Sequence, residues 1–214
     1  GKFSPKTIRD LESYGKPLIF VDSNTLYIGH SCVTTDLEDS VITALEYFLE
    51  HGHKEIGLLV GQEETADATP LQMDPRQRTF QQYLTEKGLY EERFVSVGQF
   101  STESGYQMME QLIQALGDYL PTAFFMASDA LAVGALRSLQ EHQISVPDRV
   151  SLISFNDTSI AKYVFPALST VTVYTEEMGK QAIQLLRQTF QGSQPSVPYM
   201  VKLATKLTIR DSSR

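Results

Sequence analysis

The chain has 214 residues, of which 42% are hydrophobic and 21% are charged, a composition typical of globular domains. Its formal net charge is −8 and it has no basic cluster, so the chain by itself is expected to bind nucleic acid poorly. No apolar run approaches the length of a membrane span, and the single cysteine, Cys32, excludes a disulfide framework and a cysteine-based zinc site. We therefore expect a cytoplasmic protein with no membrane partner and no metal.

Predicted helices and strands alternate along the chain. Ser4 before Pro5 predicts a first helix, because serine accepts hydrogen bonds from free N–H groups and proline suits the first turn. Thr35 and Glu38 have the spacing of a capping box, which predicts that a second helix starts there, whereas residues 23–33 show no regular pattern. Further helices are predicted at 75–88, 101–116, 129–139, 159–163 and 175–192.

Short apolar runs between these helices predict strands that are buried on both faces. They lie at 18–21, 56–60, 94–97, 121–126, 150–155 and 170–174, with two shorter extended pieces near 199–203 and 207–209. Such regular alternation of strand and helix predicts an α/β fold, with parallel sheets covered by helices on both faces.

The strand at 121–126 breaks directly into a helix at Ser128 and Asp129. Both side chains can accept hydrogen bonds from the first N–H groups of that helix. In open parallel sheets, ligands bind outside the carboxyl ends of the strands, at such breaks. On this stretch alone, helix capping is the simpler interpretation.

Other strand ends carry polar or aromatic side chains as well. Arg76 follows the loop after the strand at 56–60, Phe100 follows the strand at 94–97, and Asn156 and Asp157 follow the strand at 150–155. Together with Ser128, they would line one crevice with groups suited to a neutral, hydroxyl-rich ligand. Arginine, asparagine and aspartate grip hydroxyls, and an aromatic face covers the apolar face of a sugar ring.

Each of these residues also has a purely structural interpretation. Phe100 can belong to the core, and Asn156 with Asp157 can cap the short helix that follows. Arg76 lies in the first turn of a helix, where a positive charge is unfavourable, which favours a buried polar partner or a ligand for its guanidinium. Their shared position at strand ends makes the group more informative than any one member.

Motifs for catalysis are missing from the sequence. It contains no glycine-rich phosphate loop, no dinucleotide fingerprint and no nucleophile elbow. His51 and His53 flank a helix-ending glycine and His142 lies near another helix end, positions that favour structural roles. We therefore expect neither an enzyme nor a cofactor.

Several motifs resemble those of the lactose/galactose repressor (LacI/GalR) family, in that family's order and spacing. They are ASDALAVGAL at 127–136, VPDRVS at 146–151, SFND at 154–157, GHKEIG at 52–57, PALSTV at 166–171, EMG at 177–179 and IRDS at 209–212. They span nearly the whole chain. The Ser-Asp pair at 128–129 and the Ser-Phe-Asn-Asp motif at 154–157 are most similar to the galactose-repressor branch.

The resemblance implies a periplasmic-binding-protein-like fold of type I, in which two α/β lobes hold a small effector in a cleft between them. It places residues 1–52 and 173–203 in an N-terminal lobe, and 53–172 and 204–214 in a C-terminal lobe. The first strands of the N-terminal lobe and the helix-turn-helix DNA-binding module of family members have no counterpart in this sequence. A partial N-terminal lobe would expose apolar surface that is normally covered.

Residue by residue, the resemblance places Arg76 on the arginine that grips sugar hydroxyls and Phe100 on the aromatic that stacks on the ligand. Ser128 falls where many relatives have asparagine, and Asn156 where many have aspartate; Asp157 completes the predicted site. The implied function is that of a cytoplasmic, sugar-responsive repressor. It would bind operator DNA as a homodimer through a segment not present here, with galactose or a galactoside as the favoured effector.

Two other functions stay open on the sequence alone. The first is a solute-binding protein of a sugar transporter with the same fold, which a signal peptide upstream would favour and a helix-turn-helix would refute. The second is an α/β enzyme that acts on sugars, which measured turnover of a sugar substrate would support.

Overall fold

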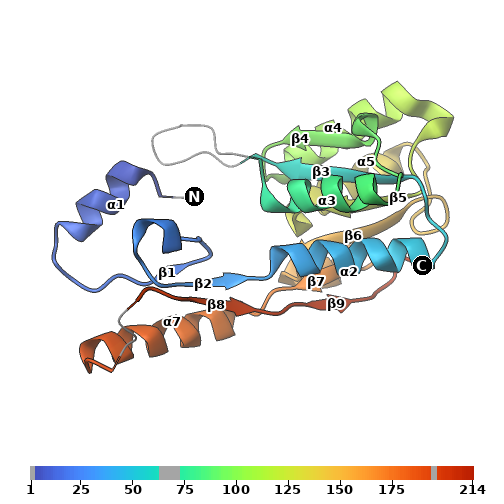
Figure 1. The fold of residues 1–214 in the computed structure, drawn as a ribbon. Coiled ribbons are helices and arrows are strands. Elements are labelled where there is room, and N and C mark those ends of the chain that lie inside the picture. Colours follow the sequence, from blue (N-terminus) through green and yellow to red (C-terminus); the bar gives the residue numbers. More distant parts are fainter. Residues whose placement is uncertain (1–2, 63–72, 194–196) are drawn as a thin grey trace. The chain divides into compact units, whose positions relative to one another are not determined.

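A computed structural model describes residues 3–62, 73–193 and 197–214 of the chain (Figure 1). The expected polar loop at 62–74 lies mostly outside the described residues. The structure divides into two compact units, each built from several segments of the chain. Of the described residues, unit 1 contains 3–36, 174–193 and 197–205, and unit 2 contains 37–62, 73–173 and 206–214.

Unit 2 is built on a six-stranded sheet with the order β4-β3-β5-β6-β7-β9. The first five strands pair in parallel and β9 pairs antiparallel to β7, with Thr172 opposite Lys206. The carboxyl ends of the five parallel strands therefore share one edge of the sheet. The strands are β3 (Ile56–Gly61), β4 (Val95–Gly98), β5 (Ala123–Met126), β6 (Ser151–Asn156), β7 (Ser169–Thr172) and β9 (Lys206–Thr208).

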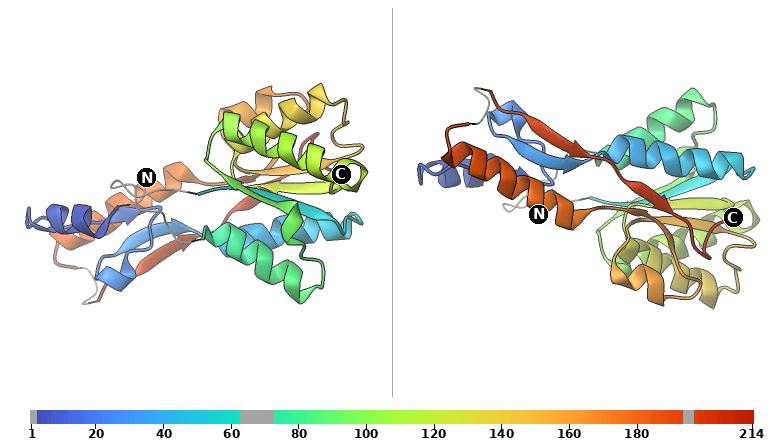
Figure 2. Two further views of the ribbon diagram at one scale, coloured as in Figure 1. Left: turned by 90° about the horizontal axis from the view of Figure 1, so that it is seen from above. Right: turned by 90° about the horizontal axis from the view of Figure 1, so that it is seen from below.

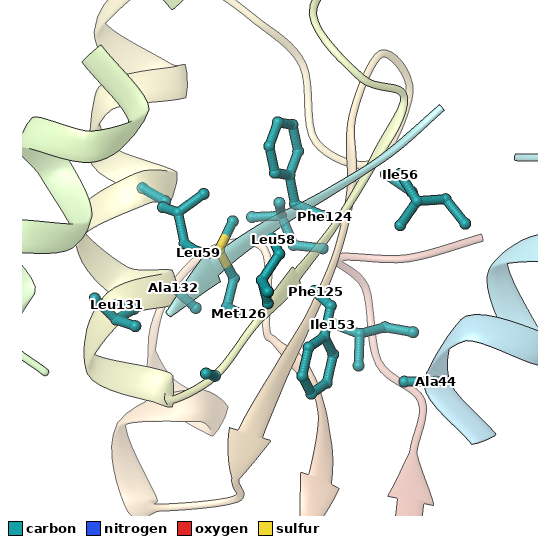
Figure 3. Close-up of a cluster of buried hydrophobic side chains, with 14 of the residues drawn as sticks. Ala44, Ile56, Leu58, Leu59, Phe124, Phe125, Met126, Leu131, Ala132 and Ile153 are labelled. Carbon is teal, nitrogen blue, oxygen red and sulfur yellow. The ribbon is translucent and has the colours of Figure 1, made fainter. Parts of the chain in front are cut away.

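Helices cover both faces of this sheet, with α2 and α3 on one side and α4 and α5 on the other (Figure 2). All residues of β3 and β5 are buried, as their apolar sequences predict, and their side chains meet those of the helices in one core (Figure 3). The helices of unit 2 are α2 (Leu37–Glu50), α3 (Pro75–Glu86), α4 (Thr102–Leu116), α5 (Asp129–Glu141) and α6 (Ser159–Tyr163).

Helices α4 and α5 pack at unusually short range, and glycines make this possible. A Cβ at Gly134 would lie 1.9 Å from the carbonyl oxygen of Thr102, and one at Gly105 would lie 2.2 Å from that of Leu131. Since side-chain carbons do not approach backbone atoms so closely, only glycine fits at either position. This contact fixes the start of α5, where Ser128 lies.

Unit 1 has a much smaller core. Its three parallel strands have the order β1-β2-β8, and Ile8, Phe20 and Cys32 form its buried apolar cluster. Several large side chains of this unit, including Tyr14, Tyr27 and Phe190, are at least 70% exposed. Its elements are α1 (Pro5–Glu12), β1 (Phe20–Val21), β2 (Cys32–Thr35), α7 (Thr175–Phe190) and β8 (Met200–Leu203).

The chain enters unit 2 earlier than expected. The resemblance places the first crossing near Gly52, but the structure places it after Asp36. The reason is helix α2, whose buried Val41, Leu45 and Phe48 pack into the same core as β3 and β5. The later divisions, after Val173 and after Thr205, lie within two residues of the expected positions.

Local signals at the helix starts had mixed success. Ser4 and Ser101 cap α1 and α4 as predicted, each accepting a hydrogen bond from an N–H group of the first turn at 3.1 Å. The predicted capping box at Thr35 is wrong, because Thr35 ends strand β2 and its hydroxyl donates to the sulfur of Met178. Strand β2 itself falls at the end of a segment predicted to be irregular.

No helix of the described residues is long and apolar enough to span a membrane.

Candidate functional site

The predicted site residues all lie in unit 2, at the edge of the sheet where the parallel strands end. Along the chain, β3 is followed by β4 on one side of it, and then by β5 on its other side. The strand order therefore reverses between β3 and β5, the position at which open α/β sheets bind ligands. Arg76, Phe100 and Ser128 follow β3, β4 and β5, and Asn156 ends β6.

Arg76 is held at the start of α3 by the residue that caps this helix. Asp74 accepts the backbone N–H of Arg76 at 2.9 Å, and its two oxygens accept Nε and Nη2 of the same side chain at 2.9 and 2.8 Å. The two side chains are only 7% and 11% exposed. Asp74 thus supplies the buried partner that the position of a cation at a helix start requires.

The guanidinium of Arg76 reaches from α3 across the switch point to β5. Its Nη1 donates to the carbonyl oxygen of Ala127 at 2.6 Å, immediately before Ser128. An arginine side chain has five N–H groups, and the bonds to Asp74 and Ala127 use three of them. Two N–H groups are left without an acceptor among the described residues, so they are available to a ligand.

Two aromatic rings flank this guanidinium. Cζ of Arg76 lies 5.0 Å from the ring centre of Phe100 and 5.1 Å from that of Phe155, within the range of cation–π attraction. Phe155 is buried, whereas Phe100 is half-buried. The Phe100 ring also lies on the last residue of β3, because a Cβ at Gly61 would come within 2.4 Å of it.

Ser128, and not Asp129, caps helix α5. Its Oγ accepts the backbone N–H of Leu131 at 3.2 Å, and the residue is half-buried. A serine hydroxyl that accepts one hydrogen bond keeps its own hydrogen to donate. Capping and ligand binding are therefore compatible at this residue.

Asn156 ends β6 and Asp157 follows it, and the side chains of these two residues differ in their hydrogen-bond partners. Both residues have positive φ, at 106° and 56°. Asp157 accepts hydrogen bonds from Thr172 and Arg210, so it has protein partners for both carboxylate oxygens. Asn156 is half-buried, and no hydrogen bond within the described chain involves its side chain.

The structure thus brings Arg76 and Phe100 into contact, and connects Arg76 to Ser128 through the carbonyl of Ala127. Among the described residues, no hydrogen bond or ring contact joins the side chain of Asn156 to these three side chains, although Phe155 beside it lies against Arg76. The carboxylate of Asp157 is instead bound to Arg210 and Thr172.

Sequence reasoning missed the central role of Asp129. This residue is 2% exposed, and its carboxylate accepts hydrogen bonds from Ser154 at 2.6 Å and Thr170 at 2.9 Å. It also accepts the backbone N–H and the hydroxyl of Thr158 at 2.6 and 2.8 Å. The start of α5 is thereby bound to β6, β7 and the start of α6, which fixes the edge where the site lies.

Signals for the two missed aspartates are present in the sequence. Ser154 and Thr170 are hydroxyl residues in segments predicted to be buried strands, and buried hydroxyls need a partner such as Asp129. Asp74 stands directly before Pro75 and two residues before Arg76, the arrangement of a helix cap that can turn back on an arginine. In the described ranges, no group of three or more His, Cys, Asp or Glu residues could hold a metal ion.

Comparisons with known proteins assign this chain to a family. Residues 45–213 match the family model of the periplasmic binding protein-like domain. The chain is 51% identical over 214 residues to the HTH-type transcriptional regulator GalR of Streptococcus thermophilus, covering all of this chain and 64% of that protein. The chain spans a similar share of other curated relatives, about 64% of their length.

Two solved structures are similar to the whole described fold. A complex of the transcriptional regulator CelR with cellobiose matches 98% of this chain and 63% of that chain, with 25% identity and a TM-score of 0.84. A LacI-family regulator from Enterococcus faecium with bound ribose matches 98% of this chain over 75% of its own length, with 26% identity and a TM-score of 0.78.

These relatives are named as transcriptional regulators and not as enzymes, which agrees with the absence of catalytic motifs from the sequence. They also confirm the expected periplasmic-binding-protein-like fold. The chain belongs to the periplasmic binding protein-like domain family, among the effector-binding regions of the LacI/GalR transcriptional regulators.

Proposed function

We propose that the chain binds a small sugar as the effector-binding region of a sugar-responsive transcriptional repressor. The sugar would bind at the carboxyl edge of the unit 2 sheet, in contact with Arg76, Phe100, Ser128 and Asn156. In the whole protein, the occupied site would favour one conformation of the dimer and so change its affinity for operator DNA. Such a protein would act in the cytoplasm.

One observation carries the proposal, namely the arrangement of unused hydrogen-bonding groups around Arg76. Two N–H groups of a nearly buried guanidinium, the Ser128 hydroxyl and the Asn156 amide have capacity to spare at one sheet edge. Adjacent hydroxyls of a sugar supply both donors and acceptors for such groups, and the half-buried Phe100 ring offers an apolar face. The ligand needs no negative charge, because Asp74 already neutralises Arg76.

Galactose or a galactoside is the proposed effector. The support is the 51% identity to a regulator named GalR. The related regulators that were solved with cellobiose and ribose support a sugar ligand in general. Binding of operator DNA and formation of a homodimer are proposed for the whole protein, because the chain spans only part of its relatives' length.

Calorimetric titration tests the proposal. The chain is titrated with D-galactose, lactose and their phosphates, and saturable one-site binding to galactose or lactose is the expected result. Cellobiose and ribose serve as comparison sugars. If none of the galactose compounds binds, the galactose assignment is wrong; if no sugar binds at all, the proposed function is wrong.

A further inference from the structure

The backbone conformation at Asn156 and Asp157 is one that other parts of the chain have to stabilise. Both residues have positive φ, at 106° and 56°, a backbone conformation that is uncommon outside glycine, although asparagine and aspartate adopt it more readily than other residues. Interactions with the surrounding chain stabilise such a conformation. Asn156 is one of the proposed ligand-binding residues. The position of its side-chain amide therefore depends on what stabilises this conformation.

Backbone interactions fix part of this segment, because Asn156 pairs with Thr172 in the sheet and the N–H of Asp157 donates to the Thr170 hydroxyl at 3.3 Å. The carboxylate of Asp157 adds two side-chain partners. One oxygen of its carboxylate accepts Nη2 of Arg210 at 2.7 Å, and the other accepts the hydroxyl of Thr172 at 2.9 Å. The side chains of Asp157 and Arg210 are 11% and 17% exposed, so water screens this ion pair only weakly. Arg210 is itself fixed, because Nη1 donates to the carbonyl oxygen of Leu168 at 2.8 Å.

One partner of Asp157 lies on β7, by which the chain leaves unit 2, and the other lies two residues after β9, by which the chain re-enters it. Thr172 ends β7, one residue before the chain leaves unit 2 after Val173. Arg210 follows β9, which begins at Lys206, where the chain re-enters this unit. Since the Thr172 hydroxyl donates to Asp157, it must accept from the Thr208 hydroxyl, 2.7 Å away, so the hydrogen bonds join Asp157 to both strands.

We infer that Asp157 is a positioning residue: its bonds to Thr172 at the end of β7 and to Arg210, after β9, hold Asn156 in place for the ligand. Its carboxylate does not contact the ligand. The inference rests on the proposed function, because it concerns how the sugar site is built. It also links the site to the connecting strands: a ligand that moves Asn156 acts on the same hydrogen bonds.

A double-mutant cycle separates positioning from direct contact. The variants are Asp157→Asn, Arg210→Met and the pair together, and the readout is the Kd for D-galactose. If Asp157 acts through Arg210, each single variant should raise the Kd by about tenfold, and the double variant should bind no more weakly than the weaker single variant. Arg210→Met is the more informative single variant, because Arg210 is not among the predicted ligand-binding residues and, under the inference, its loss raises the Kd through Asp157.

A variant matched for loss of stability serves as the control. Val150→Ala removes buried apolar contacts just before β6, at the opposite end of that strand from Asn156, and should leave the Kd unchanged. A Kd that rises in Arg210→Met but not in Val150→Ala, at equal loss of thermal stability, supports positioning.

A second measurement needs no variant. In an amide NMR titration of the unsubstituted chain with D-galactose, the signals of Lys206–Thr208 should shift together with that of Asn156. An unchanged Kd in Arg210→Met, or a large effect of Asp157→Asn alone, overturns the inference while leaving the proposed function intact. If the unsubstituted chain does not bind galactose or lactose, the proposed function fails and the inference fails with it.

Discussion

The ion pair of Asp74 and Arg76 makes the combined substitution of these two residues the sharpest test of the site. Arg76→Met alone leaves the 7% exposed carboxylate of Asp74 without its cation. Removal of one partner from a buried pair costs about 3–5 kcal/mol of unfolding free energy, and we expect about 3 kcal/mol here because the pair keeps some exposure. Loss of ligand binding in that variant would therefore be confounded by loss of stability.

The double variant Asp74→Asn with Arg76→Met removes this problem. An asparagine at 74 has an amide oxygen that still accepts the N–H of residue 76, so the cap of α3 is kept. With no charge left unpaired, the loss of stability should fall to about 1–2 kcal/mol. Urea unfolding of the two variants measures this difference.

Galactose binding should nevertheless be much weaker in the double variant. Two N–H groups of Arg76 are available to the ligand, and hydrogen bonds from a charged group contribute about 1.5 kcal/mol each. Their loss amounts to about 3 kcal/mol, or about a 100-fold increase in Kd by calorimetry. Arg149→Met is the matched control, because Arg149 binds backbone carbonyls before the start of β5, at the other edge of the sheet. A folded double variant with the Kd of the unsubstituted chain would refute the role of Arg76.

Three further substitutions have specific expected outcomes. Gly61→Ala should displace the Phe100 ring, since its Cβ would lie 2.4 Å from that ring, and should weaken galactose binding at a cost of about 1–3 kcal/mol in stability; unchanged calorimetry would contradict the close packing. Ser128→Ala should lower the unfolding free energy by about 1 kcal/mol through loss of the cap, and should also raise the Kd; a stability effect without a Kd effect would leave Ser128 as a cap only. Asp129→Ala should cost more than about 3 kcal/mol in urea unfolding, because four hydrogen bonds to a buried carboxylate are lost; a milder loss would mean that the carboxylate does not hold this edge together.

Strong local patterns predicted most of unit 2. Continuous apolar runs are typical of strands buried on both faces, and all of the residues of β3 and β5 are buried. The strand at 94–97 was also expected to be buried, but β4 lies at the edge of the sheet and none of its residues is fully buried. The start of α4 was predicted at Ser101 because a cap is a local interaction, within reach of a short sequence window.

Long-range interactions explain what the sequence could not predict. Thr35 has the local pattern of a cap, but pairing of β2 with β8 makes it the end of a strand, and that pairing joins residues far apart in the chain. Helix α2 was expected in the other unit because its assignment depends on which core its apolar face packs into, and no local pattern specifies this. The role of Asp129 has the same cause: its hydrogen-bond partners Ser154 and Thr170 come from other segments of the chain.

The site was predicted as a set of residues at strand ends, and the structure adds how they are connected. The place of Arg76 at a helix start favoured a buried polar partner or a ligand for its guanidinium, and the structure gives Asp74 as a buried partner. The bond from Arg76 to Ala127 and the tie from Asp157 to Arg210 depend on side-chain geometry, and composition or spacing carries no signal for them.

The most direct test of the central claim is an amide NMR map of the 214-residue chain titrated with D-galactose. A sugar site at the carboxyl edge of the unit 2 sheet predicts that the largest shifts fall on Arg76, Phe100, Ser128 and Asn156, with saturation at the calorimetric Kd. Signals at the opposite edge of the sheet, such as that of Ala123, should change little. Saturable binding whose shifts leave those four amides unchanged would contradict the account.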